Sequence, residues 1–208
     1  VGARHAVPIQ AKAGETIDVT VIGEPGVSAQ FSIAGVSGNI SMEEAAHQPG
    51  TYAGAYTVTD NTNVTDAVLT VALKDAVGNV STDASKRVTI DTTMPEITSV
   101  IVLGSPAKPG ETVSIVLVGE SRASAQFSIA GMVDNVPMEE DKDQPGTYRA
   151  TYTATDDIAA DATLTVALAD AVGNVRTDAS KKVTVCPSWD VDRDGTIDVS
   201  DLVAIGTY

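Results

Sequence analysis

The chain has 208 residues, of which 43% are hydrophobic and 4% aromatic, and its 28 acidic and 13 basic side chains give a formal net charge of −15. Because an acidic surface repels phosphate groups, this charge excludes nucleic acids and anionic membranes as expected partners. No apolar run approaches the roughly 20 residues that a membrane-inserted helix needs, and a single cysteine, Cys186, excludes an internal disulfide framework.

Two copies of one sequence follow each other along the chain. The matching segments are 14–16 with 110–112 and 28–35 with 124–131, at a shift of 96, then 75–80 with 170–175, at a shift of 95. One residue is therefore lost between Asp60 and Asp66, where the polar composition predicts a loop. We expect two domains, residues 1–93 and 94–185, followed by a tail, residues 186–208.

Within each copy, apolar residues alternate with polar ones, which is the pattern of strands half-buried in antiparallel sheets. In chain order, the first copy alternates over residues 16–21, 29–33, 52–58, 67–73 and 88–90. The second copy alternates over residues 113–117, 127–129, 148–152 and 162–168. Nothing before Val185 has a helical period, so the repeats are expected to be all-β.

Copies of about 90 residues with about seven short strands each predict two tandem immunoglobulin-like β-sandwiches. The linking segment 88–97, the Asp-Ala-x-Gly-Asn turn at residues 75–79 and the Pro-Gly-Thr-Tyr sequence at residues 49–52 resemble tandem bacterial immunoglobulin-like repeats. Such repeats belong to large secreted or cell-surface proteins, and the resemblance covers nearly all of residues 1–185. It implies an extracellular spacer or scaffold and no catalytic activity.

The tail has the spacing of a calcium-binding loop over residues 190–201. Acidic residues occupy loop positions 1, 3, 5, 9 and 12, and Gly195 at position 6 permits the sharp bend that wraps a short chain around an ion. The expected ligands are Asp190, Asp192, Asp194, the backbone carbonyl of Thr196, Asp198, directly or through water, and Asp201. An acidic, solvated tail is the alternative interpretation.

This tail is similar to one half of a dockerin module, whose EF-hand-type loops close on Asp and lack an entering helix. The resemblance implies that the six residues named above are calcium ligands. Trp189 before the loop, and Leu202, Val203 and Ile205 after it, predict packing around the loop and a short helix. A dockerin module pairs two such loops, whereas this sequence holds one.

Two acidic runs, Glu43-Glu44 and Glu139-Glu140-Asp141, are candidates for a general acid and base. Neighbouring residues on a strand point to opposite faces, and both copies carry the run, so we interpret it as structural.

Asp75 and Asp170 stand at the start of the Gly-Asn turns and are expected to cap them, with calcium binding between strands as the alternative. Cys186 lies at the junction between the second copy and the tail. Two interpretations of it remain open, a buried small side chain and an intermolecular disulfide.

These observations predict a non-catalytic structural protein, extracellular or on a cell surface. It would act as a spacer or as a self-assembling subunit of filament or surface-layer type, with other copies of the chain as partners and calcium stabilising the contacts. Residues 1–7 align with 97–103 but are less apolar, so another chain could complete that strand. The alternative is a dockerin-bearing anchoring module of a larger secreted enzyme or adhesin, with a cohesin-like partner.

Overall fold

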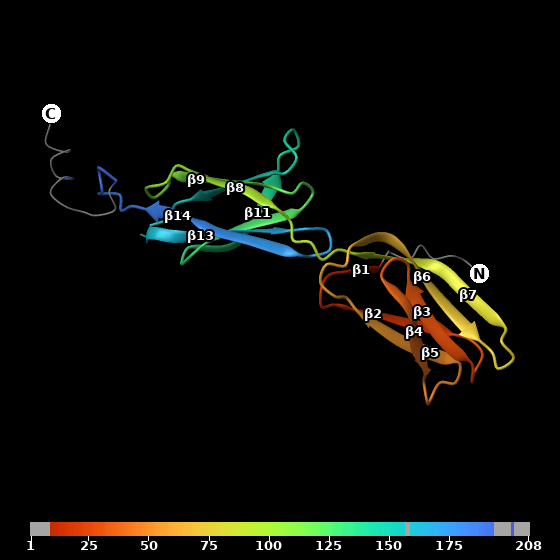
Figure 1. Ribbon diagram of the computed structural model, residues 1–208. Coiled ribbons are helices and arrows are strands. Elements are labelled where there is room, and N and C mark those ends of the chain that lie inside the picture. The colour runs from red at the N-terminus through yellow and green to blue at the C-terminus, as the bar shows by residue number, and fades with distance from the viewer. Residues whose placement is uncertain (1–8, 157–158, 194–200, 202–208) are drawn as a thin grey trace. The chain divides into compact units, whose positions relative to one another are not determined.

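The computed structural model describes residues 9–156, 159–193 and 201 of the chain. The chain divides into two compact units, Val1–Thr93 (unit 1) and Met94–Tyr208 (unit 2). Every assigned element is a β-strand, which confirms the predicted all-β class (Figure 1). Within the described ranges, no helix is long and apolar enough to cross a bilayer, and the short helix predicted after Asp201 lies outside them.

Unit 1 contains seven strands that form one continuous ribbon in the order β1-β7-β6-β3-β4-β5-β2. They are β1 (Ile9–Ala11), β2 (Thr16–Ile22), β3 (Ser28–Ile33), β4 (Ser37–Glu44), β5 (Thr51–Thr57), β6 (Val64–Lys74) and β7 (Val80–Ile90). Strand β4 pairs first with β3, as in Ala29↔Met42, and then with β5, as in Glu43↔Ala53. This change of partner folds the ribbon into two layers. All pairs are antiparallel except β1 with β7.

Unit 2 repeats this plan in the order β14-β13-β10-β11-β12-β9-β8. Its strands are β8 (Ile97–Leu103), β9 (Thr112–Gly119), β10 (Ser124–Ile129), β11 (Val133–Glu140), β12 (Thr147–Thr153), β13 (Ala159–Ala169) and β14 (Val175–Val185). One layer is β8-β9-β12-β11 and the other is β11-β10-β13-β14, which is the division of strands typical of immunoglobulin-like sandwiches. The predicted fold class is therefore confirmed.

The core of each unit lies between its two layers and is built from the alternating residues that the sequence analysis singled out. In unit 1, Ile17, Phe31, Ile33, Leu69 and Val88 are at most 3% exposed. Their counterparts in unit 2, which are buried as well, are Val113, Phe127, Ile129, Leu164 and Val183. Because alternate residues of a strand face opposite sides, this burial leaves the polar positions on the outer faces.

Candidate metal centre at the end of unit 2

The chain leaves unit 2 at the end of β14 and is fixed there by backbone hydrogen bonds. The Ala107 N–H donates to the Thr184 carbonyl (3.0 Å), and the Cys186 N–H donates to the Ala107 carbonyl (2.8 Å). Cys186 and Pro187 are buried, and the Asp190 N–H donates to the Pro187 carbonyl (3.1 Å). These contacts place Asp190 directly beside the end of the sandwich.

Three carboxylates of the predicted calcium loop converge at this point. Ligand oxygens of Asp190, Asp192 and Asp201 all lie within 4.8 Å of one another. Asp190 is fully buried and Asp201 is 3% exposed, whereas Asp192 is exposed. The structure thus brings together the first, third and last positions of the loop. Asp194, Thr196 and Asp198, the other predicted ligands, lie outside the described residues.

Backbone N–H groups orient two of these carboxylates. Asp201 Oδ1 accepts from the Val191 N–H (2.5 Å), and Asp190 Oδ1 accepts from the Arg193 N–H (2.6 Å). Both bonds are short, as is usual when the acceptor is charged. The first bond ties Asp201 back to the start of the loop, which is the closure that a wrapped ion site requires.

The donor set fits a hard divalent cation. Carboxylate oxygens are the ligands that calcium and magnesium prefer, whereas zinc and copper favour nitrogen and sulfur. Asp190, Asp192 and Asp201 would supply three of the about six to eight oxygens that calcium takes. Burying carboxylates is costly without compensating donors or cations, so a divalent ion would stabilise this arrangement.

The expectation that Trp189 packs around the loop is wrong. Its side chain is 72% exposed, because the turn that joins the Asp190 N–H to the Pro187 carbonyl buries those two residues and leaves Trp189 outside. Leu202, Val203 and Ile205, predicted to pack with it, lie outside the described residues.

An ion pair that the sequence analysis missed joins the tail to unit 2. The Arg193 guanidinium Nη2 lies 2.9 Å from Glu111 Oε1, and Glu111 Oε2 accepts from the Lys108 N–H (2.9 Å). The Lys108 N–H and Arg193 together lower the pKa of Glu111. The two side chains are 82 positions apart, so only the fold reveals that the start of the tail lies on its own sandwich.

Cys186 is buried, which confirms the interpretation as a small core side chain. Burial and a hydrogen bond to Asp190 raise the pKa of its thiol. The protonated thiol is therefore the stable form at this junction.

The two acidic turns have the capping role that was predicted. Asp75 Oδ1 accepts from the N–H groups of Val77 (3.0 Å) and Asn79 (2.8 Å), and Asp75 Oδ2 accepts from Asn79 Nδ2 (2.7 Å). Asp170 makes the same set of bonds in unit 2. Both oxygens of each carboxylate are thus used within the turn, and the capping interpretation is confirmed.

The duplicated glutamates hold loops together, which confirms their structural interpretation. Glu140 Oε1 accepts from the N–H groups of Gly146 (2.7 Å) and Arg122 (3.0 Å). Glu44 does the same in unit 1, with Gly50 (2.6 Å) and Gly26. In both copies a glycine follows the glutamate by six residues, as Gly50 follows Glu44 and Gly146 follows Glu140. Sequence reasoning could have used this repeated spacing.

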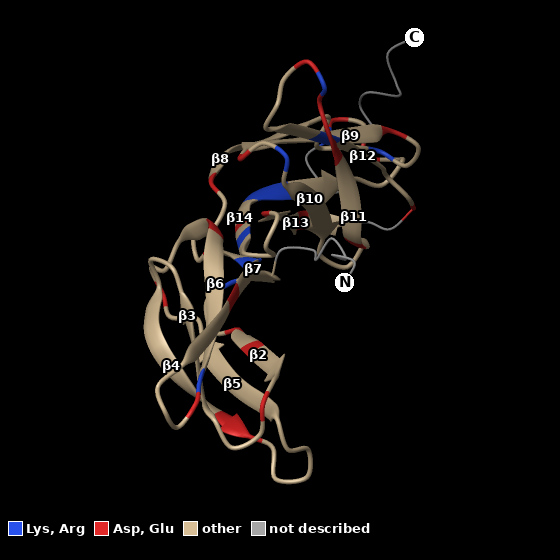
Figure 2. Cartoon of the chain, turned by 90° about the vertical axis from the view of Figure 1, so that its right-hand side faces the viewer, with Lys and Arg blue, Asp and Glu red and all other residues tan. Residues whose placement is uncertain are grey.

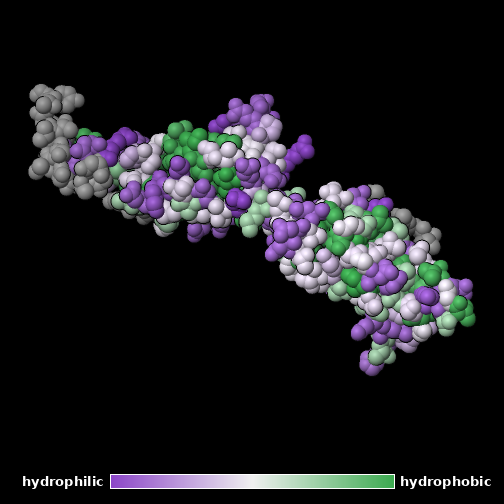
Figure 3. All heavy atoms as spheres, viewed as in Figure 1, coloured by the Kyte–Doolittle hydropathy of each residue, from purple (hydrophilic) through white to green (hydrophobic). Residues whose placement is uncertain are grey.

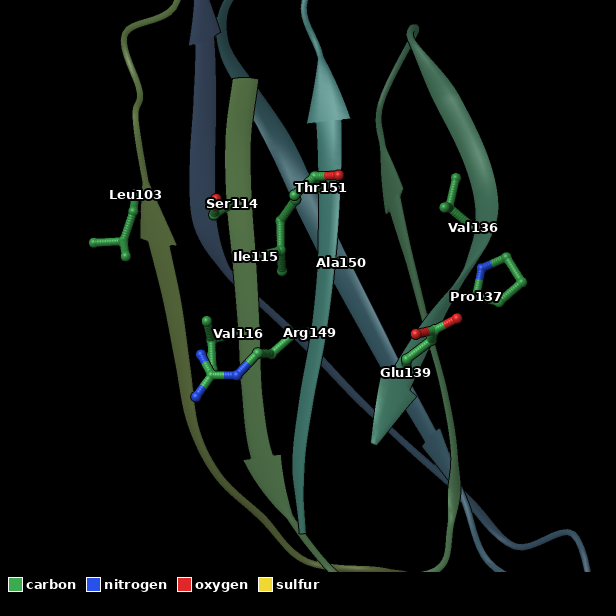
Figure 4. A pocket seen from close by; sticks show the side chains of 10 residues that line it. All are labelled: Leu103, Ser114, Ile115, Val116, Val136, Pro137, Glu139, Arg149, Ala150 and Thr151. Atoms are coloured by element: carbon green, nitrogen blue, oxygen red, sulfur yellow. The ribbon is translucent and has the colours of Figure 1, made fainter. Parts of the chain in front are cut away.

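A hollow on the β8-β9-β12-β11 layer also has acidic and basic residues beside apolar side chains (Figure 4). Its lining includes Leu103, Val116, Glu139 and Arg149. Figure 4 shows the Arg149 and Glu139 side chains pointing in different directions, and Arg149 Nε instead lies 3.2 Å from Asp141 Oδ2. The hollow therefore does not bring an acid and a base to one point.

The other acidic residues do not gather at one place either. Figure 2 shows Asp and Glu spread over the strands and loops of each unit, within the described ranges, rather than gathered in one cleft. The converging group of three carboxylates at the end of unit 2 stands apart from this distribution.

No protein-family model matches the chain, and neither does any curated protein. Similar solved structures include fibronectin(III)-like modules of Clostridium thermocellum CbhA, with a TM-score of 0.46 and 16% identity over 87% of this chain and 92% of that one. An I-band fragment from titin gives a TM-score of 0.49 and 12% identity over 86% of this chain and 63% of that one. The immunoglobulin-like assignment rests on the strand order and register of the chain itself.

Proposed function

We propose that the chain is a non-catalytic structural protein of the cell exterior. It acts as a spacer or as a self-assembling subunit of filament or surface-layer type, and calcium stabilises its contacts. The supporting observation is the convergence of Asp190, Asp192 and Asp201, two of them buried, at the end of unit 2.

Calcium is the ion we propose for this centre. Its flexible coordination by about six to eight oxygens suits a loop in which Asp194, Asp198 and the carbonyl of Thr196 complete the ligand set. With calcium bound, the negative charge of the loop is offset and the tail is held in one conformation. A chain with a net charge of −15 repels its own copies, so a divalent cation favours their association.

The absence of a catalytic role is supported by how the described polar groups are used. Asp75 and Asp170 cap turns, while Glu44 and Glu140 hold loops. An active site needs a nucleophile or base aimed at a common point with other groups. In the described part of the chain, the metal centre is where acidic groups converge, and its donors suit ion binding.

Dynamic light scattering and electron microscopy test this proposal. Purified chain in EDTA is compared with chain in calcium, alongside Asp201→Asn and, as a matched control, Asp143→Asn, which changes an exposed aspartate of the same unit. We expect calcium-dependent growth of particles for the wild type and for Asp143→Asn, but not for Asp201→Asn. Wild-type particles that stay the size of a monomer with calcium bound would contradict self-assembly.

A second candidate is an anchoring module of a larger secreted enzyme or adhesin that docks onto a cohesin-like partner. The observation that favours it is that Asp201 closes the loop against the Val191 N–H, as the resemblance to half a dockerin module implies. Calcium that stabilises a monomer without particle growth would support this candidate over self-assembly.

A further inference from the structure

In unit 2, the edge strand β9 is covered by the strand that precedes it in the chain. β8 pairs antiparallel with β9, from Ile97↔Gly119 to Leu103↔Ser114. Val100 on β8 is 7% exposed within the core, and Ile97 and Val102 pack against that core. The layer is thus closed on this side by a strand with aliphatic residues at three inward positions.

The residues just before β8 lie over the end of the same sandwich. Pro95 is buried, and its carbonyl accepts from Arg176 Nε (2.8 Å). The Glu96 carbonyl accepts from the Glu120 N–H (2.9 Å). This approach requires Gly119, because a Cβ there would lie 2.3 Å from the Glu96 carbonyl oxygen. Residues 95 and 96, which we call the strap, continue directly into β8. Together they form one segment that covers this edge and end of the sandwich.

The equivalent place in unit 1 is open among the residues that the structure describes. β2, the counterpart of β9, pairs with β5 and with no other described strand. A hollow beside the end of β2 is lined by Ile22, Leu73 and Val80 among others. Ile22 is 81% exposed and Val80 is 57% exposed. Figure 3 shows hydrophobic surface at this end of unit 1, around the turn between β6 and β7.

Unit 1 also keeps the glycine that admits the strap. Gly23 corresponds to Gly119, and Glu24, whose N–H would meet the incoming carbonyl, corresponds to Glu120. A Cβ on Gly23 would meet Leu73 Cδ1, the tip of a flexible side chain, and no described strap atom. Leu73 Cδ1 lies 2.2 Å from that Cβ position, and no backbone atom blocks it. A strap would therefore enter by moving the tip of the Leu73 side chain aside.

The chain's own first residues complement this edge poorly. Aligned on β8, residues 1–7 place Arg4 at the position of Val100 and Ala6 at that of Val102. An arginine in a core position without a partner is strongly destabilising. An aliphatic strand from elsewhere fits the same place without that penalty.

We infer that the β2 edge and its hollow form an acceptor site for an extended segment of another polypeptide chain. The segment that fits has a proline followed by aliphatic residues at the second, fifth and seventh positions, as Pro95, Ile97, Val100 and Val102 are arranged. It adds to β2 as an antiparallel strand, with backbone hydrogen bonds giving affinity and the side-chain positions giving specificity. This goes beyond the proposed function, because it concerns unit 1 and needs no calcium.

The test uses the full chain in calcium-free buffer and a fluorescent synthetic peptide with the sequence of residues 94–103. We expect saturable binding by fluorescence anisotropy and slower hydrogen exchange over Thr16–Ile22, without change over Thr112–Gly119. Gly23→Ala, which fills the strap's space, should weaken binding at least tenfold. Gly38→Ala, whose Cβ lies in open space, should leave it unchanged. Equal circular dichroism spectra confirm that both variants fold.

Two further arms identify the occupant. A peptide carrying Val100→Arg should bind at least tenfold more weakly, because it puts a charge at the buried position. A chain lacking residues 1–7 should bind the original peptide at least as well as the full chain does. Binding to the shortened chain alone would show that residues 1–7 fill the edge, and binding to neither would show that no acceptor site exists. Either result overturns the inference.

Discussion

Tyr148 at the start of β12 shows how single side chains hold the loops of these sandwiches. It is 1% exposed, and its hydroxyl donates to the Glu120 carbonyl (2.7 Å) and accepts from the Ala123 N–H (2.9 Å). Tyr52 makes the corresponding pair of bonds in unit 1. The hydroxyl thus serves two backbone groups of the loop between β9 and β10.

Removing this hydroxyl should destabilise unit 2. Tyr148→Phe leaves a backbone carbonyl and an N–H without their partner, which costs about 1–3 kcal/mol. Tyr152→Phe is the matched control, because its hydroxyl has only a 3.5 Å contact with Thr155 Oγ1. Urea unfolding measures both variants, and an equal loss of stability in the two would contradict this role of Tyr148.

Glu140 makes the stability of unit 2 depend on pH. Hydrogen bonds from the N–H groups of Gly146 and Arg122 lower the pKa of this carboxyl in the folded chain. A lowered folded pKa means that the carboxylate stabilises the fold above its unfolded pKa of about 4.3, and that this contribution is lost as the pH falls through the folded value.

The variant Glu140→Gln should therefore lose less stability than the wild type on acidification. Urea unfolding at pH 6 and at pH 3 measures the difference, with Glu139→Gln as the neighbouring control. A wild type and a Glu140→Gln variant that lose stability equally over this range would contradict the assignment.

Among the elements, strands with a clean alternation could be predicted and strands without one could not. The alternating residues located β2, β3, β5 and β6, because each has one face in the core. β4 was not placed, since it changes layers and only Met42 on it is buried.

The last strand of unit 1 shows the same limit. The alternation marked residues 88–90, whereas β7 runs over Val80–Ile90. Its first eight residues are exposed and carry no apolar pattern. Cross-strand hydrogen bonds to β6, which composition does not reveal, extend this strand.

The carboxylate cluster at the end of unit 2 was predictable in its residues but not in its setting. Loop spacing alone pointed to Asp190, Asp192 and Asp201. The burial of Pro187 and the ion pair between Arg193 and Glu111 depend on contacts with unit 2. Such contacts between distant residues leave no local pattern in a sequence.

The alternation of buried and exposed residues on β8 can be tested by substitution. Val100→Arg places a charge in the core and should destabilise unit 2 by about 3 kcal/mol or more. Ile101→Arg, on the next residue and 43% exposed, should change stability by about 0.5 kcal/mol or less. Urea unfolding compares the two, and similar losses would contradict the strand's inward and outward assignment.

At the scale of the whole molecule, the two sandwiches and the acidic tail suggest separate roles in spacing and in attachment. In the sandwiches, carboxylates hold turns and loops, as Asp75, Asp170, Glu44 and Glu140 do. The carboxylates that converge lie at the end of unit 2. The β2 edge, which has no second strand partner among the described residues, is the second contact place that we infer. On this account the sandwiches provide spacing, and the metal centre and the strand edge provide attachment.

Isothermal titration calorimetry of the intact chain with calcium tests the central claim most directly. We predict uptake of one ion per chain, lost in Asp190→Asn and Asp201→Asn and retained in Asp143→Asn. No heat of binding up to millimolar calcium in the wild type, or equal binding in all four proteins, would contradict the account.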